Sequence, residues 1–149
     1  MLEIHYENDG DVLNMPYRKY LQDGAYDLHA NEKVSIPAKG YATVDTGIRI
    51  QIPMGHVGLV CSRSGLAADK GIFVLNAPGI IDSGYSGNVK VILGNLGDAS
   101  YHVGHGMRIA QIMIMPLLDY YFNPGKVWGA ERGNNGFGST GISMIDPEF

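Results

Sequence analysis

The sequence predicts an all-β domain with one short helix and a flexible C-terminal arm. Glycine makes up 21 of the 149 residues, which is roughly twice its average frequency, so the chain contains many turns. Short segments of alternating or continuous apolar character lie between these turns. Strands at such spacing, interrupted by glycine and proline, are typical of a sandwich, a barrel or a jelly roll. The length suits a single domain.

The strands are expected where apolar residues alternate with polar ones or run continuously. These segments are residues 2–7, 33–37, 41–53, 56–62, 72–76, 88–95 and 107–116. A helix is expected only at residues 64–71, where a serine can cap the start and a glycine can end it. Another turn is expected within residues 13–22. Low complexity from Asn123 onward places the end of the core at residue 122 and assigns residues 123–149 to the arm.

Two strands carry apolar residues on both faces: VKVILGNL at 89–96 and IAQIMIMPLL at 109–118. One face of each can pack on the core of the domain, but the other must also avoid water. A partner subunit could cover that face, or a second sheet of the same domain could. The sequence leaves both explanations open.

The charge and composition exclude several classes of protein. A net charge of −4 speaks against nucleic-acid binding, which usually relies on a basic face. A few arginines and backbone amides can still hold a small anion. No apolar run approaches the roughly 18 residues of a membrane span, and the first residues lack the features of a signal peptide. The lone Cys61 excludes a disulfide framework and fits a reducing cytoplasm.

Residues 61–71, CSRSGLAADKG, place an arginine, two serines and a glycine around the start of the expected helix. Guanidinium, hydroxyl and free N–H groups at a helix start attract phosphate. The alternative is an ordinary capped turn with a surface arginine. The P-loop pattern is not present.

Residues 76–91, NAPGIIDSGYSGNVKV, predict a β-hairpin with Asp82 and Tyr85 between two apolar strands. Asp82 fits a solvated turn residue, but a carboxylate held beside a tyrosine ring could also orient and deprotonate a water. An ordinary aspartate is a weak base at neutral pH, so this role would require partial burial.

Asp27 and Gln111 stand among apolar residues, where polar groups need partners. Asp27, in AYDLHA, fits a salt bridge or a metal site. Gln111, in GMRIAQIMIMP, fits a buried amide contact or a ligand contact through its backbone. The five histidines predict no metal site.

Residues 132–141, RGNNGFGSTG, combine four glycines with an arginine and a phenylalanine. Glycine amides can wrap closely around phosphate oxygens, the guanidinium adds a bidentate positive group, and the ring offers a face to a base. Such a segment could close over a nucleotide as a lid. A disordered tail is the alternative.

In this order, AYDLHA, SRSGLA, NAPGIIDSGYSGNVKV, GMRIAQ and RGNNGFGSTG resemble the five motifs of the trimeric dUTP diphosphatase (dUTPase) family. The resemblance covers residues 25 to 141. It implies a jelly-roll-like β-barrel and a homotrimer with active sites at the subunit interfaces. It also implies an enzyme that hydrolyses dUTP to dUMP and pyrophosphate with Mg²⁺, which keeps uracil out of DNA and supplies dUMP for dTMP synthesis. The lone cysteine favours a cytoplasmic location for this enzyme. Direct contacts with nucleic acid or membrane are not expected.

The resemblance also implies roles for the residues of the hairpin. Asp82 matches the aspartate that orients the water attacking the α-phosphorus. Tyr85 matches the tyrosine that stacks under the deoxyribose and crowds a ribose 2′-hydroxyl. Asn76, with the backbone through Ile81 and Val89, matches the reader of uracil, where a wrong base leaves buried polar groups unpaired.

The phosphate and metal contacts are implied in the same way. Arg63, Ser64, Gly65 and Gln111 match residues that contact phosphate. Asp27 matches the acid that supports the metal through water, since Mg²⁺ tends to retain its waters.

In the arm, the clamp on the γ-phosphate is matched by Arg132, Gly138, Ser139 and Thr140. Phe137 matches the ring that covers uracil. Because the family's arm crosses to a neighbouring subunit, the trimer is expected to be required for activity, and it would also cover the doubly apolar strands.

Some positions depart from the family pattern: Ser62, Ser86, Asn88 and Met107. None removes a group assigned to chemistry, but together they put the strength of the trimer in question. A dCTP deaminase is a second hypothesis. That family uses a glutamate as its proton shuttle, and the hypothesis is disfavoured because no glutamate lies between Glu32 and Glu131. A nucleotide-dependent regulatory protein is a third.

Overall fold

Antiparallel strands form most of the folded part of the computed structural model, which describes residues 2–9 and 11–129. The all-β class with one short helix is confirmed. The described strands form separate small sheets and no closed barrel. In chain order the elements are β1 (His5–Asn8), η1 (Val12–Asn14), β2 (Tyr26–His29), β3 (Val34–Ile36), β4 (Tyr41–Asp45), β5 (Ile48–Gln51), β6 (His56–Cys61), α1 (Ser64–Lys70), β7 (Ile72–Val74), β8 (Gly79–Ile81), β9 (Lys90–Asn95), β10 (Tyr101–Val103) and β11 (Arg108–Pro116).

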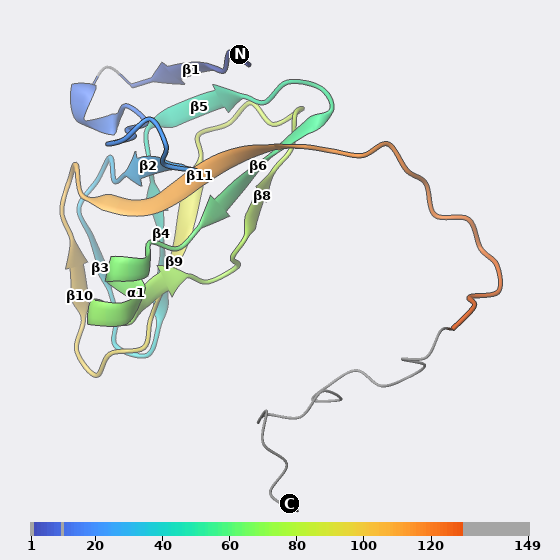
Figure 1. Ribbon diagram of the computed structural model, residues 1–149. Helices are drawn as coiled ribbons and strands as arrows, with labels where there is room; N and C mark the ends of the chain where they lie inside the picture. The colour runs from blue at the N-terminus through green and yellow to red at the C-terminus, as the bar shows by residue number, and fades with distance from the viewer. Residues whose placement is uncertain (1, 10, 130–149) are drawn as a thin grey trace, which may run out of the picture. The chain divides into compact units, whose positions relative to one another are not determined.

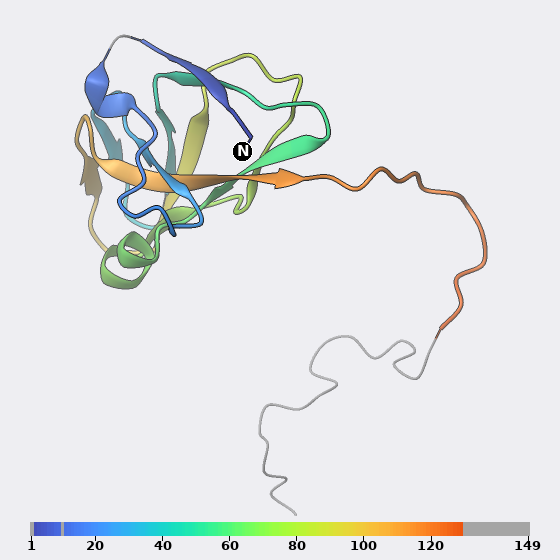
Figure 2. The ribbon, with the colours of Figure 1, turned by 45° about the horizontal axis from the view of Figure 1, so that its top comes forward.

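The strands of the described residues are distributed over four sheets. The largest has the order β2-β11-β6-β8, and a three-stranded sheet has the order β4-β9-β7. Two short pairs, β1-β5 and β10-β3, complete the set. The pair β1-β5 lies at one end of the folded core and α1 at the other (Figures 1 and 2). The strand β11 is central to the largest sheet because it pairs with both β2 and β6.

The core follows from the alternation of side chains along the strands. In β11, Ala110 and Ile112 are buried, and their cross-strand partners Leu28 and Val60 are buried with them. The alternate residues Gln111 and Met113 point to the other face of the sheet and are only partly buried. The doubly apolar character of β11 therefore divides into a core face and a half-exposed face.

The predicted helix is confirmed. It begins after Arg63 and ends at Gly71, which has a φ of 65° and whose N–H contacts the carbonyl oxygen of Ala67. This is the left-handed conformation that glycine adopts without steric cost.

The predicted hairpin at residues 76–91 is wrong in its pairing. The strands on either side of the loop belong to different sheets: β8 pairs with β6, whereas β9 pairs with β4 and β7. The loop between them, residues 82–89, is much longer than the two-residue turn that aligns hairpin strands. Gly58 on β6 also leaves room for Ile81, since a Cβ there would lie 3.1 Å from the Cβ of Ile81.

The chain divides into two units, residues 1–119 and 120–149. Residues 120–129 of the second unit contain no helix or strand. The predicted division at residue 122 stays a prediction. No helix within the described residues is long and apolar enough to cross a lipid bilayer.

Candidate active site

A cationic cluster forms around Asp27 on the outer face of the largest sheet. The guanidinium Nε of Arg63 lies 2.9 Å from Oδ1 of Asp27, and Arg108 reaches Oδ2 at 3.4 Å. Arg63 also donates to the carbonyl oxygen of Arg108 at 3.2 Å. Both carboxylate oxygens are therefore engaged, and two guanidinium groups surround one carboxylate. Such an excess of positive charge suits an anionic ligand.

Gln111 lies beside this cluster, because it is the cross-strand partner of Asp27 on one side and of Cys61 on the other. Its side chain donates to the carbonyl oxygen of Ser62 at 2.8 Å, and the hydroxyl of Ser62 accepts the N–H of Val74 at 2.8 Å. Asp27 and Gln111 both line a pocket of about 210 Å³. Ser64 and Gly65 follow Arg63 at the exposed start of α1.

The sequence reasoning missed Arg108 and Ser62 as part of this cluster. Arg108 begins the same strand as Gln111. Its place in the motif that contains Gln111 is the signal from which it could be predicted. Ser62 connects the end of β6 to β11 and β7 through its carbonyl and hydroxyl groups, and these contacts form only in the folded chain.

His29 is a further polar residue on the same strand as Asp27, two positions along it, so both side chains lie on one face. It is buried, and its Nδ1 has no hydrogen-bond partner within the described residues. Burial lowers the pKa of His29; the nearby Arg108 and Arg63 add to this, while Asp27 opposes it. The imidazole is therefore held in the neutral form.

Asp82 and Tyr85 lie on the loop that follows β8. The N–H of Tyr85 donates to the carbonyl oxygen of Asp82 at 3.1 Å, which closes a turn. The Tyr85 hydroxyl donates to the carbonyl oxygen of Asn88 at 2.8 Å, and Tyr85 lines a cleft of about 360 Å³. The Asp82 side chain is exposed, so one chain alone does not supply the partial burial that a catalytic base would need.

The three residues of the 76–91 segment that are predicted to read uracil differ in accessibility. Asn76 is exposed and Ile81 is half-buried. Val89 is buried, and its N–H and C=O are bonded to Ile48 and Thr46 within the chain. Asn76 and Ile81 are therefore the more open to a ligand.

The Asp27 cluster and the Asp82 loop lie at opposite edges of the largest sheet. Asp27 is on the edge strand β2, and Asp82 directly follows the other edge strand, β8. Three interstrand spacings, or about 14 Å, separate these edges. The strand register separates them further. Asp27 is level with Gln111 on β11, whereas Ile81 is level with Ile114, which lies three residues or about 10 Å further along that strand. One chain therefore does not bring the two groups together.

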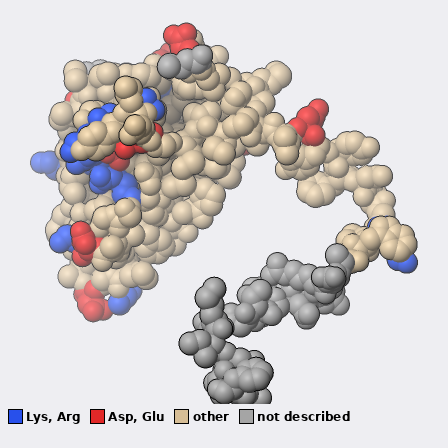
Figure 3. Space-filling model, in the orientation of Figure 1, with Lys and Arg blue, Asp and Glu red and all other residues tan. Residues whose placement is uncertain are grey.

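The sheet face between them is apolar. Ile80, Leu59 and Met113 form one cross-strand row, and the Ile80 side chain is 57% exposed. On the face seen in Figure 3, the surface over β6 and β8 carries no charged side chains, and most of those of the core lie on the side of β2 and α1. The predicted arm residues Arg132, Phe137, Gly138, Ser139 and Thr140 lie outside the described residues.

The fold and these two groups define an all-β protein with a candidate site for an anionic ligand. A family model described as dUTPase matches residues 11–141. A deoxyuridine 5'-triphosphate nucleotidohydrolase from Cutibacterium acnes is 41% identical over 135 residues, which cover 89% of this chain and 89% of that protein. A protein of the same name from Roseobacter denitrificans is 42% identical over 139 residues, with coverage of 89% and 91%.

A solved structure gives the same result. The dUTPase of Staphylococcus bacteriophage 80alpha with dUPNHPP superposes with a TM-score of 0.86 and 26% identity, and the match covers 95% of this chain and 100% of that one. The chain belongs to the dUTPase family.

Proposed function

We propose that this protein hydrolyses dUTP to dUMP and pyrophosphate by attack of water on the α-phosphorus. Its family and the activity that its relatives are named for support the reaction, and the phage dUTPase with dUPNHPP supports the substrate class. The observation that carries the assignment to residues is the loop at 82–89, which holds an aspartate and a tyrosine three positions apart in one hydrogen-bonded turn.

In this mechanism Asp82 accepts a hydrogen bond from the attacking water and orients it towards phosphorus. Water attack breaks the bond between the α-phosphorus and its bridging oxygen, and pyrophosphate leaves with that oxygen. Tyr85 packs against the deoxyribose and excludes a 2′-hydroxyl by crowding. Asn76 and the backbone through Ile81 and Val89 read the uracil edge, and Asn76 and Ile81 are the more accessible of these.

The cationic cluster binds the phosphates in this proposal. Arg63 and Gln111 flank Asp27, and Ser64 and Gly65 follow at the start of α1. Guanidinium groups match phosphate oxygens in geometry and charge. Arg108 adds positive charge to this group.

Enzymes of the dUTPase family generally use Mg²⁺. Among the described residues no cluster of three histidine, cysteine or acidic side chains could hold a metal by itself. Asp27, whose oxygens are already paired with arginines, fits an ion that the phosphates carry and that the carboxylate contacts through water. Bound there, Mg²⁺ would neutralise charge on the phosphates.

The separation of the two groups favours an active site shared between subunits, which we infer to be those of a homotrimer. A second copy can present its Asp27 cluster to the Asp82 loop of the first, and the apolar row at Ile80, Leu59 and Met113 offers a surface for such contact. Burial by the neighbouring subunit would strengthen Asp82 as a base.

The arm completes the site in this proposal. Arg132, Gly138, Ser139 and Thr140 hold the γ-phosphate, and Phe137 covers uracil. A cytoplasmic location also stays a prediction.

The proposal is tested by incubating the protein with dUTP or dCTP and Mg²⁺ and measuring pyrophosphate and ammonia. Pyrophosphate from dUTP alone is the expected result. Ammonia from dCTP would instead indicate a deaminase, and neither product would indicate a binding or regulatory protein.

A further inference from the structure

We propose that Asn88 positions Tyr85 for sugar discrimination, and that it can do so because its side chain is a neutral donor placed between two carboxylates. The inference deepens the proposed function, since it rests on the assigned role of Tyr85. Asn88 itself is not expected to touch the substrate.

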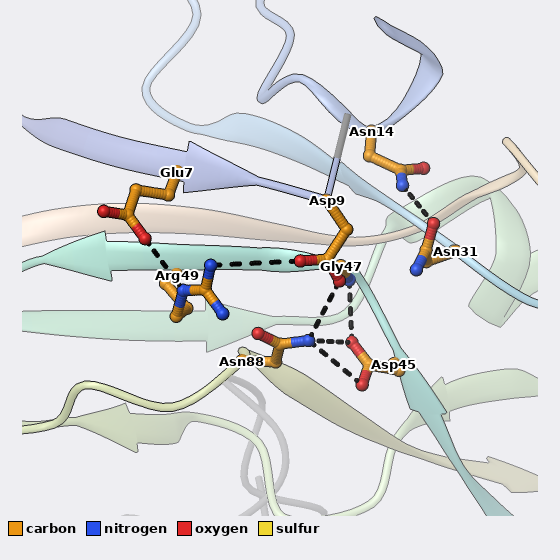
Figure 4. Close-up of polar contacts among 8 residues, drawn as sticks. All are labelled: Glu7, Asp9, Asn14, Asn31, Asp45, Gly47, Arg49 and Asn88. Carbon is orange, nitrogen blue, oxygen red and sulfur yellow. Dashed lines mark hydrogen bonds and ion pairs between the residues drawn. The ribbon is translucent and has the colours of Figure 1, made fainter. Parts of the chain in front are cut away.

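Asn88 connects the tyrosine to the body of the fold through both its backbone and its side chain. Its carbonyl oxygen accepts the Tyr85 hydroxyl at 2.8 Å. Its side-chain Nδ2 lies 3.2 and 3.3 Å from the two oxygens of Asp45 and 3.3 Å from Oδ2 of Asp9 (Figure 4). An amide nitrogen carries two N–H donors, so one side chain can bond to both carboxylates.

The two carboxylates are themselves held in place. Oδ1 of Asp45 accepts the N–H of Gly47 at 2.7 Å, and the N–H of Asp9 donates to the carbonyl oxygen of Gly47 at 3.0 Å. Arg49 lies 4.0 Å from the other oxygen of Asp9. Asn88 therefore bonds to groups that are anchored at the turn between β4 and β5 (Figure 4).

The charge of this network disfavours a carboxylate at position 88. Glu7, Asp9 and Asp45 contribute three negative charges, and Arg49 contributes one positive charge that is shared with Glu7 at 3.0 Å. A carboxylate at position 88 would have no proton to donate and would face two like charges at hydrogen-bond distance. It would push the end of the loop away from the turn.

The position of the Tyr85 ring depends on this end of the loop. The ring packs against the backbone of Gly87, where an added Cβ would lie 2.9 Å from Cζ. Beyond Asn88, the N–H of Val89 donates to Ile48 at 2.8 Å. The ring is thus held by a short segment that is anchored by the side chain of Asn88 and by the backbone of Val89. Exclusion of a 2′-hydroxyl by crowding requires a ring that is fixed in this way.

The test compares the ratio of kcat/KM for dUTP to that for UTP in four variants. Asn88→Asp is expected to lower this ratio by about tenfold or more through like-charge repulsion. Asn88→Ala, which removes the donors without adding charge, is expected to lower it about three- to tenfold, as for loss of one hydrogen bond.

The matched control exchanges the amide donor at position 88 with the carboxylate acceptor at position 45. In Asn88→Asp combined with Asp45→Asn, the new amide can donate to the new carboxylate while its oxygen still accepts the N–H of Gly47, and the charge of the network is unchanged. This double variant is expected to recover at least about threefold of the lost ratio. An unchanged ratio in Asn88→Asp, or a double variant no better than the single one, would overturn the inference.

Tyr85→Ala separates this inference from the proposed function. If it lowers the ratio while Asn88→Asp does not, the inference alone fails. If it leaves the ratio unchanged, the assigned role of Tyr85 fails as well.

Discussion

Replacement of Gly87 by alanine tests whether the Tyr85 ring must lie where the structure places it. A Cβ at position 87 would lie 2.7 Å from the Tyr85 hydroxyl oxygen, and ordinary contact begins at 3.4 Å, so the ring or the loop must shift by about 0.7 Å. That shift would lengthen the 2.8 Å bond from Tyr85 to Asn88 to about the limit for a hydrogen bond.

The loss of this bond costs roughly 1 kcal/mol. Misplacement of a substrate-contacting group by about 1 Å can lower a rate up to about 100-fold. We therefore expect Gly87→Ala to lower kcat/KM for dUTP by about tenfold, and to lower the value for UTP less, because the ring no longer excludes the 2′-hydroxyl. The unfolding free energy should change by only about 1 kcal/mol, since Tyr85 and its bond are exposed.

Steady-state kinetics with both nucleotides, together with thermal unfolding, measure these effects. Gly84→Ala is the matched control in the same loop, because a Cβ at Gly84 meets no atom within 4 Å. Wild-type kinetics in Gly87→Ala, or an equal loss in Gly84→Ala, would refute the reasoning.

Three further predictions concern the catalytic carboxylate, the arm and the buried histidine. Asp82→Asn should abolish turnover, with a loss of at least about 10² to 10⁴-fold, while dUTP binding by calorimetry stays largely intact. Truncation after Gly129 removes residues 130–149 of the arm, including Arg132 and Phe137, and should reduce turnover by about 10²-fold or more, with little change in the thermal stability of the core. His29 has a pKa below its ordinary value of 6.5, so the unfolded chain binds a proton before the folded protein does as the pH falls. The unfolding free energy should therefore decrease below about pH 6.5, and His29→Gln should reduce that decrease in urea titrations between pH 5 and pH 8.

Each of these has an outcome that contradicts it. Loss of binding with normal turnover in Asp82→Asn would remove its assignment to water activation. A fully active truncated enzyme would show that the arm plays no part in hydrolysis. An identical pH profile in His29→Gln would mean that the histidine titrates alike in the folded and unfolded states.

The sequence alone determined the all-β class, the single helix and the motifs that indicate a dUTPase. These features depend on local properties: side-chain alternation marks the strands, and Gly71 ends the helix at a positive φ. The five motifs could be recognised for the same reason, since each is a short run of adjacent residues.

Only the tertiary structure decided which strands pair and how the motifs are distributed over the sheet. Asp27 meets Arg63, 36 positions away, and Arg108, 81 positions away. The loop at 82–89 connects two sheets rather than two paired strands, and the Asp27 cluster lies at the opposite edge of the largest sheet from Asp82. Register and strand order follow from the packing of many side chains at once, so no short segment contains this information.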